Sequence, residues 1–288
     1  MIDRKRNSLY NKYCEKPLRN KLYRELIFFM NIITAYATKN DCYIIRQPMT
    51  PVGIVLHSTG ANNPNLKRYV DCPSECGKNW YGNHWNNPSS KIGEQCVHSF
   101  VGYDKYNKVR VANILPYNYA CWGCGRGKHG SYNYNPTGHI QIELCEDNLT
   151  NEAYFNAVFS TAAEYCAMLC KQFNLHPATI VGHCEAYRKG YASNHADPEH
   201  WFKKHGKTMG DFRKLVESFL SVQARYLVRV TTDVLNVRKG AGTNHNVVTT
   251  VKKNEVYTII EEKVVGNDVW GRLKSQVGWI CLTYTKKI

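Results

Sequence analysis

The feature that most constrains the fold is a set of four short apolar runs, each bounded by polar or turn residues. They are Gly53–Leu56, Cys96–Val101, Ile140–Leu144 and Thr179–Val181. Runs this short and this apolar are typical of strands in a sheet that is covered on both faces. Helical patterns alternate with them, so the sequence predicts an α/β fold with a mixed central β-sheet flanked by helices.

Two helical patterns supply the covering layer. In the first, apolar residues recur every three or four positions from Phe155 to Phe173, and Thr150 or Asn151 is a plausible N-cap. The second runs from about Met209 to Leu220. We therefore expect two long amphipathic helices against the sheet.

From about Arg225 the pattern changes to short strand-like runs separated by glycine-containing turns, which is typical of a small all-β barrel. Because a chain of 288 residues exceeds the usual size of one core, two folded domains are expected. The expected boundaries are a partly helical N-terminal extension at 1–40, a catalytic domain at 41–220, a short linker at 221–225 and the barrel at 226–288.

The N-terminal extension has some features of an export signal. The apolar run Leu26–Phe29 follows basic residues, and Ala35–Ala37 resembles a signal-peptidase site. However, the leading segment is long and mixed in charge, so we expect synthesis in the bacterial cytoplasm and leave export by a signal peptide as the alternative. No stretch reaches the roughly 20 apolar residues of a membrane-spanning helix, so no integral membrane segment is expected.

The formal net charge of +15 indicates a polyanionic partner or surrounding. The basic residues are dispersed and accompany no nucleic-acid-binding motif, so we expect no specific nucleic acid. Anionic cell-wall polymers would satisfy the same electrostatics. A solvated basic surface without a specific partner remains an open alternative.

The twelve cysteines do not suggest a disulfide scaffold, because such scaffolds are short secreted chains and several of these cysteines fall in predicted core elements. Cys72, Cys76, Cys121 and Cys124 have a tolerable spacing for a second, structural zinc site. Both pairs lie in loop-like stretches, so we expect free thiols or a local disulfide there instead.

Three residues form a candidate catalytic zinc site. His57 and His183 each end a strand-like run, and Asp197 follows in a turn fixed by Pro198. A catalytic zinc takes three protein ligands and keeps one position open for water. Each residue alone is weak evidence, and the prediction rests on the set.

Glu143 is a candidate general base. Strand alternation in the run 139–144 sends the aliphatic side chains to one face and His139, Gln141 and Glu143 to the other. Burying a glutamate on a central strand costs free energy unless the carboxylate is paired with a cation or has a catalytic role. Beside Zn²⁺ it could accept a proton from water. An ion pair with a lysine or arginine is the alternative.

Four runs carry a family resemblance: IVLHSTGANNP, HIQIELCED, VGHCEAY and SNHADPEHWF. In this order and spacing they resemble the type 2 N-acetylmuramoyl-L-alanine amidases, a family that includes phage endolysins and peptidoglycan recognition proteins. The resemblance covers about residues 41–215. It implies one zinc ion held by His57, His183 and Asp197, with Glu143 beside it, and hydrolysis of the amide bond between N-acetylmuramic acid and L-alanine in peptidoglycan.

Two departures from the family pattern affect the rest of the site. Trp122 is followed by Gly123 where members often have His, and Val97 precedes His98 where some members have Tyr. His98, His139 and His195 are therefore candidates for a secondary catalytic role, and His195 could instead orient a metal ligand. Trp80, Trp85 and Trp122 are candidates to stack on the glycan, with core packing as the alternative.

The C-terminal part resembles a bacterial SH3 domain, through Leu235–Gly240, Trp270–Leu273 and Gly278–Ile280. Such domains bind cell walls and raise the local concentration of a catalytic domain at its insoluble substrate. The combination implies a phage or prophage endolysin, or a bacterial autolysin, that acts as a monomer on the wall. The competing hypotheses are a non-catalytic peptidoglycan-binding or sensing protein of the same fold and, without a motif behind it, a nucleic-acid binder.

Overall fold

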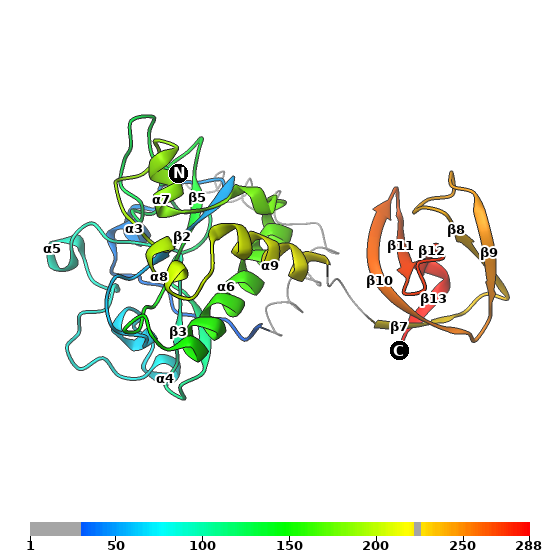
Figure 1. The fold of residues 1–288 in the computed structure, drawn as a ribbon, viewed down its shortest axis with the longest axis horizontal. Helices are drawn as coiled ribbons and strands as arrows, with labels where there is room; N and C mark the ends of the chain where they lie inside the picture. The colour runs from blue at the N-terminus through cyan, green and yellow to red at the C-terminus, as the bar shows by residue number, and fades with distance from the viewer. Residues whose placement is uncertain (1–29, 222–225) are drawn as a thin grey trace, which may run out of the picture. The chain divides into compact units, whose positions relative to one another are not determined.

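The computed structural model describes residues 30–221 and 226–288 (Figure 1). The chain divides into two units, Met1–Val216 and Glu217–Ile288, called unit 1 and unit 2 below. Residues 1–29 of the predicted N-terminal extension, with the apolar run Leu26–Phe29, and residues 222–225 of the predicted linker lie outside the described residues. In the described ranges, no helix combines the length and apolarity needed to cross a bilayer.

Unit 1 contains a six-stranded sheet in the order β1-β4-β3-β5-β2-β6. β3 and β4 are antiparallel, and every other neighbouring pair is parallel, so the sheet is mixed as predicted. The strands are β1 (Ile33–Thr34), β2 (Gly53–Ser58), β3 (Ser99–Tyr103), β4 (Val109–Asn113), β5 (His139–Leu144) and β6 (Ile180–Gly182).

Three strands differ from the sequence prediction. β4, the antiparallel partner of β3, was not among the predicted runs. β3 begins at Ser99 rather than Cys96, although the amide of His98 still donates to the carbonyl of Gln141 on β5 at 2.9 Å. β1 pairs in parallel with β4, so the sheet begins before residue 41. β1 was not predicted from the sequence, because two residues are too few to show the alternation that identifies a strand.

The helices of unit 1 lie between and after the strands. The long helix α6 begins after Asn151, whose side chain accepts a hydrogen bond from the amide of Tyr154 at 3.0 Å, in agreement with the predicted cap. The helices are α3 (Asp41–Ile45), α4 (Pro73–Cys76), α5 (Ser89–Ile92), α6 (Glu152–Phe173), α7 (His183–Arg188), α8 (Glu199–Lys204) and α9 (Met209–Ser221), with short 3₁₀ turns at Leu66–Arg68 and Pro177–Thr179. α9 begins in unit 1 and ends in the first residues of unit 2.

An aromatic cluster joins α6, α8 and α9, which Figure 1 shows running close together. Phe159 of α6 lies 5.1 Å from Phe202 and 5.2 Å from Phe212 between ring centroids, and Phe155 lies 5.3 Å from Trp201. Full burial of each such ring is worth about 2–3 kcal/mol. Because α8 starts two residues after Asp197, this cluster also anchors the loop that carries that carboxylate.

Unit 2 is an antiparallel seven-stranded sheet in the order β13-β7-β10-β11-β12-β8-β9, which agrees with the predicted all-β domain. Alternate apolar residues, among them Val228, Val237, Ile259 and Ile280, form its core. Its strands are β7 (Tyr226–Val230), β8 (Val234–Arg238), β9 (Val247–Lys252), β10 (Val256–Val265), β11 (Asp268–Leu273), β12 (Trp279–Cys281) and β13 (Thr285–Lys287), with a 3₁₀ turn at Leu282–Tyr284.

Candidate functional site

The carboxyl ends of β2, β5 and β6 meet at one edge of the sheet in unit 1. β2 pairs in parallel with β5 in a register that places His57 opposite Glu143. β6 pairs in parallel with β2, and the chain passes directly from β6 into α7, whose first residue is His183. Ligands of open α/β sheets commonly bind at this edge. Three of the predicted site residues are therefore brought together by strand pairing.

Asp197 reaches the same edge from the loop that precedes α8. Its backbone carbonyl accepts a hydrogen bond from the amide of Cys184 at 3.2 Å. Its Oδ2 accepts another from the amide of Ser58 at 3.3 Å. These contacts tie the loop to α7 and to the end of β2.

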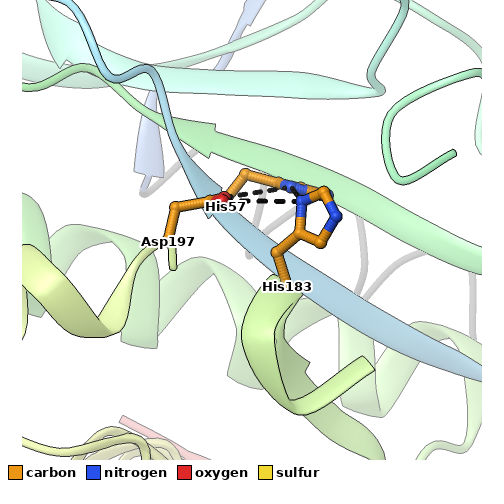
Figure 2. A group of neighbouring side chains, drawn as sticks. All are labelled: His57, His183 and Asp197. Carbon is orange, nitrogen blue, oxygen red and sulfur yellow. Dashed lines mark hydrogen bonds and ion pairs between the residues drawn. The ribbon is translucent and has the colours of Figure 1, made fainter. Parts of the chain in front are cut away.

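His57, His183 and Asp197 converge on one point (Figure 2) and are all buried. His57 Nδ1 lies 3.0 Å from His183 Nδ1 and 3.3 Å from Asp197 Oδ2, and His183 Nδ1 lies 3.6 Å from Asp197 Oδ1. Within residues 30–221 and 226–288, this is the one group of three or more His, Cys, Asp or Glu side chains that could hold a metal ion. We call these three residues the metal-site cluster.

Gln141 determines which nitrogen of His57 faces the cluster. Its Oε1 lies 2.6 Å from His57 Nε2, and an amide oxygen can only accept, so Nε2 carries the proton. The lone pair of Nδ1 therefore points into the cluster. Asn133 holds Gln141 in turn, because Asn133 Oδ1 accepts a hydrogen bond from Gln141 Nε2 at 2.9 Å. Strand alternation predicts the face on which Gln141 lies but not this contact.

The members of the cluster shift one another's pKa values. Burial alone would raise the pKa of Asp197, but His183 and His57 outweigh it and hold that pKa well below its usual value. Burial alone would lower the pKa of His57, but Asp197 and Glu143 outweigh it and raise the pKa. For His183 burial dominates, and its pKa is lowered. The cluster thus favours an ionised carboxylate next to two imidazoles, which suits a cation.

Glu143 is partly buried beside the cluster, and its Oε2 has no hydrogen-bond partner in the described part of the chain. Burial raises its pKa to about 8, with repulsion from Asp197 contributing and attraction to His57 opposing. Among the described residues, no lysine or arginine forms an ion pair with it. Glu143 therefore has a free oxygen and an unusually basic carboxylate.

A pocket of about 720 Å³ contains the metal-site cluster and Glu143. Trp85, Trp122 and His195 also line it. The ring of His195 stacks on that of His183 with centroids 4.5 Å apart, and His195 Nδ1 lies 3.7 Å from Asp197 Oδ1. His195 can therefore support the ligands or face a substrate.

Two candidate histidines lie in the core and do not line this pocket. His98 Nδ1 accepts a hydrogen bond from the amide of Gln141 at 3.0 Å, and its Nε2 lies 2.9 Å from the carbonyl of Tyr119. His139 stacks on Tyr132 with ring centroids 3.9 Å apart. Burial lowers the pKa of both histidines to about 4. Their contacts are those of neutral packing residues.

Trp80 also lies away from the pocket. Its side chain is 78% exposed, and Lys78 Nζ sits 3.7 Å from the centre of its ring. Trp85, five residues later, packs edge-to-face on Phe100 and lines the pocket. The two tryptophans, both candidates for glycan stacking from the sequence, therefore have different surroundings in the structure.

A polar chain at the rim of the pocket was not apparent from the sequence. Ser58 Oγ donates a hydrogen bond to Glu146 Oε1, which also lies 3.0 Å from His200 Nε2. Ser58 and His200 line the pocket, and Glu146 is buried behind them. The three residues come from different segments, so no spacing pattern connects them.

The cysteines considered for a second zinc site lie in separate surroundings. Cys76 and Cys72 pack in one apolar cluster, Cys121 in a second and Cys124 in a third. Cys124 Sγ lies 3.1 Å from Asn133 Oδ1. The cysteines in the described ranges are free thiols.

Comparisons with known proteins match both units. Residues 47–200 match the family model described as N-acetylmuramoyl-L-alanine amidase, and residues 233–284 match that of the bacterial SH3 domain. A search of curated proteins gives no match.

Several solved structures also resemble the chain. The Staphylococcus aureus hydrolase AmiA in complex with its ligand is 19% identical, with coverage of 70% of this chain and 91% of that chain and a TM-score of 0.48. The PlyG catalytic domain is 19% identical, with coverage of 66% and 94% and a TM-score of 0.45. A mutant endolysin from Bacillus subtilis is 17% identical, with coverage of 65% and 99% and a TM-score of 0.43.

Proposed function

Because the chain belongs to the N-acetylmuramoyl-L-alanine amidase family, we propose that it uses zinc to hydrolyse the amide bond between N-acetylmuramic acid and L-alanine in peptidoglycan. The observation that carries the proposal is the convergence of His57, His183 and Asp197 in the pocket that Glu143 also lines. All four residues are present, so this observation favours an enzyme over a non-catalytic sensor.

The cluster fits a zinc ion. Two imidazole nitrogens and one carboxylate oxygen, with room for water, are a known ligand set of catalytic zinc. The lone pair of His57 Nδ1 faces Asp197 Oδ2 at 3.3 Å, and two such groups repel each other unless a proton or cation lies between them. His57, His183 and Asp197 would hold the metal. When bound, zinc supplies Lewis-acid polarisation of the scissile carbonyl and of water.

Glu143 would transfer the proton. The attacking water must lose a proton, and the amide nitrogen must gain one before it leaves as an amine. Glu143 Oε2 has no partner within the described residues, so it can accept the first proton. Burial raises the pKa of Glu143, which strengthens the carboxylate as a proton acceptor, and the protonated acid can then deliver that proton to the nitrogen. The products are a carboxylate on the muramic acid side and a free L-alanine amine.

The remaining residues would position the substrate and the ligands. Gln141 and Asn133 orient His57, and such outer contacts commonly raise metal affinity. Trp85 and Trp122 offer ring surface to a sugar at the pocket wall. His195 remains a candidate for orienting either Asp197 or the scissile carbonyl.

Unit 2 would hold the enzyme on the wall, since residues 233–284 match the bacterial SH3 domain. We assign residues 41–220, together with β1, to the catalytic domain and residues 226–288 to the wall-binding domain. The protein would be made in the bacterial cytoplasm and act at the wall, as a phage or prophage endolysin or as an autolysin.

Digestion of purified cell walls, followed by mass spectrometry of the products, tests the proposal. We expect glycan strands stripped of stem peptides, and peptides with a free L-alanine amine. A His57→Ala protein that remains folded should release neither. Cleavage between sugars, or inside the stem peptide, would refute the assignment of the bond.

A further inference from the structure

Three large aromatic side chains stand out on the surface of unit 1. Trp80 is 78% exposed, Tyr81 88%, and Tyr106, in the turn between β3 and β4, 66%. Trp80 and Tyr81 do not line the pocket of the metal-site cluster, so the proposed hydrolysis does not use them. Exposed aromatic rings grouped in this way often mark a binding surface.

Lysines accompany these rings. Lys78 Nζ lies 3.7 Å from the ring centre of Trp80, and Lys105 Nζ lies 4.9 Å from that of Tyr106. Both contacts are within the range of cation–π attraction, which orders the ammonium groups beside the rings.

The two lysine–aromatic pairs belong to one surface. The amide of Lys105 donates a hydrogen bond to the carbonyl of Glu75 at 3.0 Å. A Cβ placed on Gly77, the residue before Lys78, would lie 3.5 Å from side-chain carbons of both Lys67 and Lys105. The segment before Trp80 therefore packs against the turn that carries Tyr106. We call this set the Lys–aromatic surface: Lys67, Lys78, Trp80, Tyr81, Lys105 and Tyr106.

The acidic groups nearby are already engaged. Glu75 and Asp104 both pair with Arg110, at 2.7 and 3.6 Å. Asp71 Oδ2 accepts a hydrogen bond from Asn86 at 2.9 Å. In contrast, the described residues include no carboxylate in an ion pair with the three lysines of the surface. The surface thus keeps its positive charge next to exposed rings.

We propose that the Lys–aromatic surface binds a polyanionic, phosphodiester-linked polymer of the cell wall. The ammonium groups would pair with successive phosphates, and the rings would cover the apolar edges of the sugar or polyol between them. The inference rests on the proposed function in one respect, namely that the enzyme works at the wall. The proposal assigns a binding role to some of the lysines that produce the net charge of +15. The metal-site cluster does not account for this excess of positive charge.

Binding of the full chain to poly(glycerol phosphate) at low salt tests the proposal. The charge variant is Lys78→Glu with Lys105→Glu. The matched control is Lys204→Glu with Lys214→Glu, two exposed lysines on α8 and α9 with the same total charge change. We expect the charge variant to bind at least tenfold more weakly and the control less than twofold more weakly. Trp80→Ala should weaken binding severalfold, because the ring contributes apolar contact. This loss should be smaller than that of the charge variant, because the ring carries no charge.

Two further arms identify the ligand. On whole walls the charge variant should bind less than the parent protein, and this difference should vanish on walls stripped of phosphodiester polymers by hydrofluoric acid. Hydrolysis of a soluble muramyl peptide should be unchanged in all variants, so failure of this inference is distinguishable from failure of the amidase proposal. Equal weakening by the control pair, a difference that persists on stripped walls, or tighter binding to single-stranded DNA than to the polymer would overturn it.

Discussion

His57 on β2 lies directly opposite Glu143 on β5, in a parallel pair of two interior strands of the sheet. A proposed metal ligand and the candidate general base are thus fixed by backbone register, not by a loop. Sites built on paired strands hold their geometry more precisely than sites on loops. The two side chains are also coupled electrostatically, because Glu143 helps to raise the pKa of His57 while His57 opposes the rise in the pKa of Glu143.

Glu143→Gln should lower kcat about 10²- to 10⁴-fold, since the amide cannot accept or deliver the proton. Zinc content should stay at the parent level, because Glu143 is not a member of the metal-site cluster. Steady-state hydrolysis of a soluble muramyl peptide measures kcat, and metal analysis measures the zinc content. Glu164→Gln, at an exposed glutamate of α6, is the control, and a Glu143→Gln enzyme as active as that control would exclude Glu143 as the base.

Gln141→Met should weaken zinc binding about 10- to 100-fold, since His57 loses the acceptor that fixes its Nε2 proton. Gln141→Glu keeps an oxygen acceptor at the same place and should retain most of the affinity. Competition with a chromophoric chelator measures both constants. Equal affinities for the Met and Glu variants would mean that the contact does not orient the ligand.

Trp122→Ala should raise KM for a soluble muramyl peptide about tenfold with little change in kcat, because the lost ring surface contributes to binding and not to proton transfer. Trp80→Ala is the matched control and should leave both constants unchanged, since Trp80 lies outside the pocket. A larger effect from Trp80 than from Trp122 would show that the substrate follows a different path across unit 1.

The unfolding free energy should depend on His139 at acidic pH. The fold holds the pKa of this imidazole at about 4, against an ordinary value of 6.5, so the neutral form is favoured in the folded state. The unfolded chain therefore binds more protons, and the stabilising effect is fully present above pH 6.5 and is lost as the pH falls toward 4. The loss amounts to about 3 kcal/mol across this interval.

Urea unfolding of the parent protein and of His139→Asn between pH 4 and 7 measures this dependence. The plot of unfolding free energy against pH should be steeper for the parent protein, by the amount that corresponds to uptake of about one proton on unfolding. The difference in unfolding free energy between the two proteins should therefore narrow as the pH falls. Parallel curves would mean that folding leaves the pKa of His139 unchanged.

The sequence predicted the parts of the site that depend on local patterns. Aliphatic runs ending in His57 and His183 marked two strand ends, and alternation in 139–144 placed Glu143 on the polar face. Parallel pairing then brings such residues together without further information. The start of α6 was predictable for the same reason, because Asn151 caps it through a contact within its own segment.

Contacts between distant segments were not predictable. The bond between Gln141 and His57 depends on how the side chains fill the space between paired strands, and the chain from Ser58 through Glu146 to His200 joins three separate segments. Trp80 and Trp85 stand in one loop region without periodicity, so only the fold separates the exposed ring of Trp80 from the partly buried ring of Trp85.

Zinc titration of the metal-stripped protein tests the central claim most directly. Hydrolysis of a soluble muramyl peptide should be absent after treatment with a chelator and should return in full as zinc approaches one equivalent per chain. The same titration of His183→Ala should recover neither tight zinc binding nor activity. Undiminished hydrolysis by the metal-free parent protein, or full recovery by His183→Ala, would contradict a zinc amidase built on His57, His183 and Asp197.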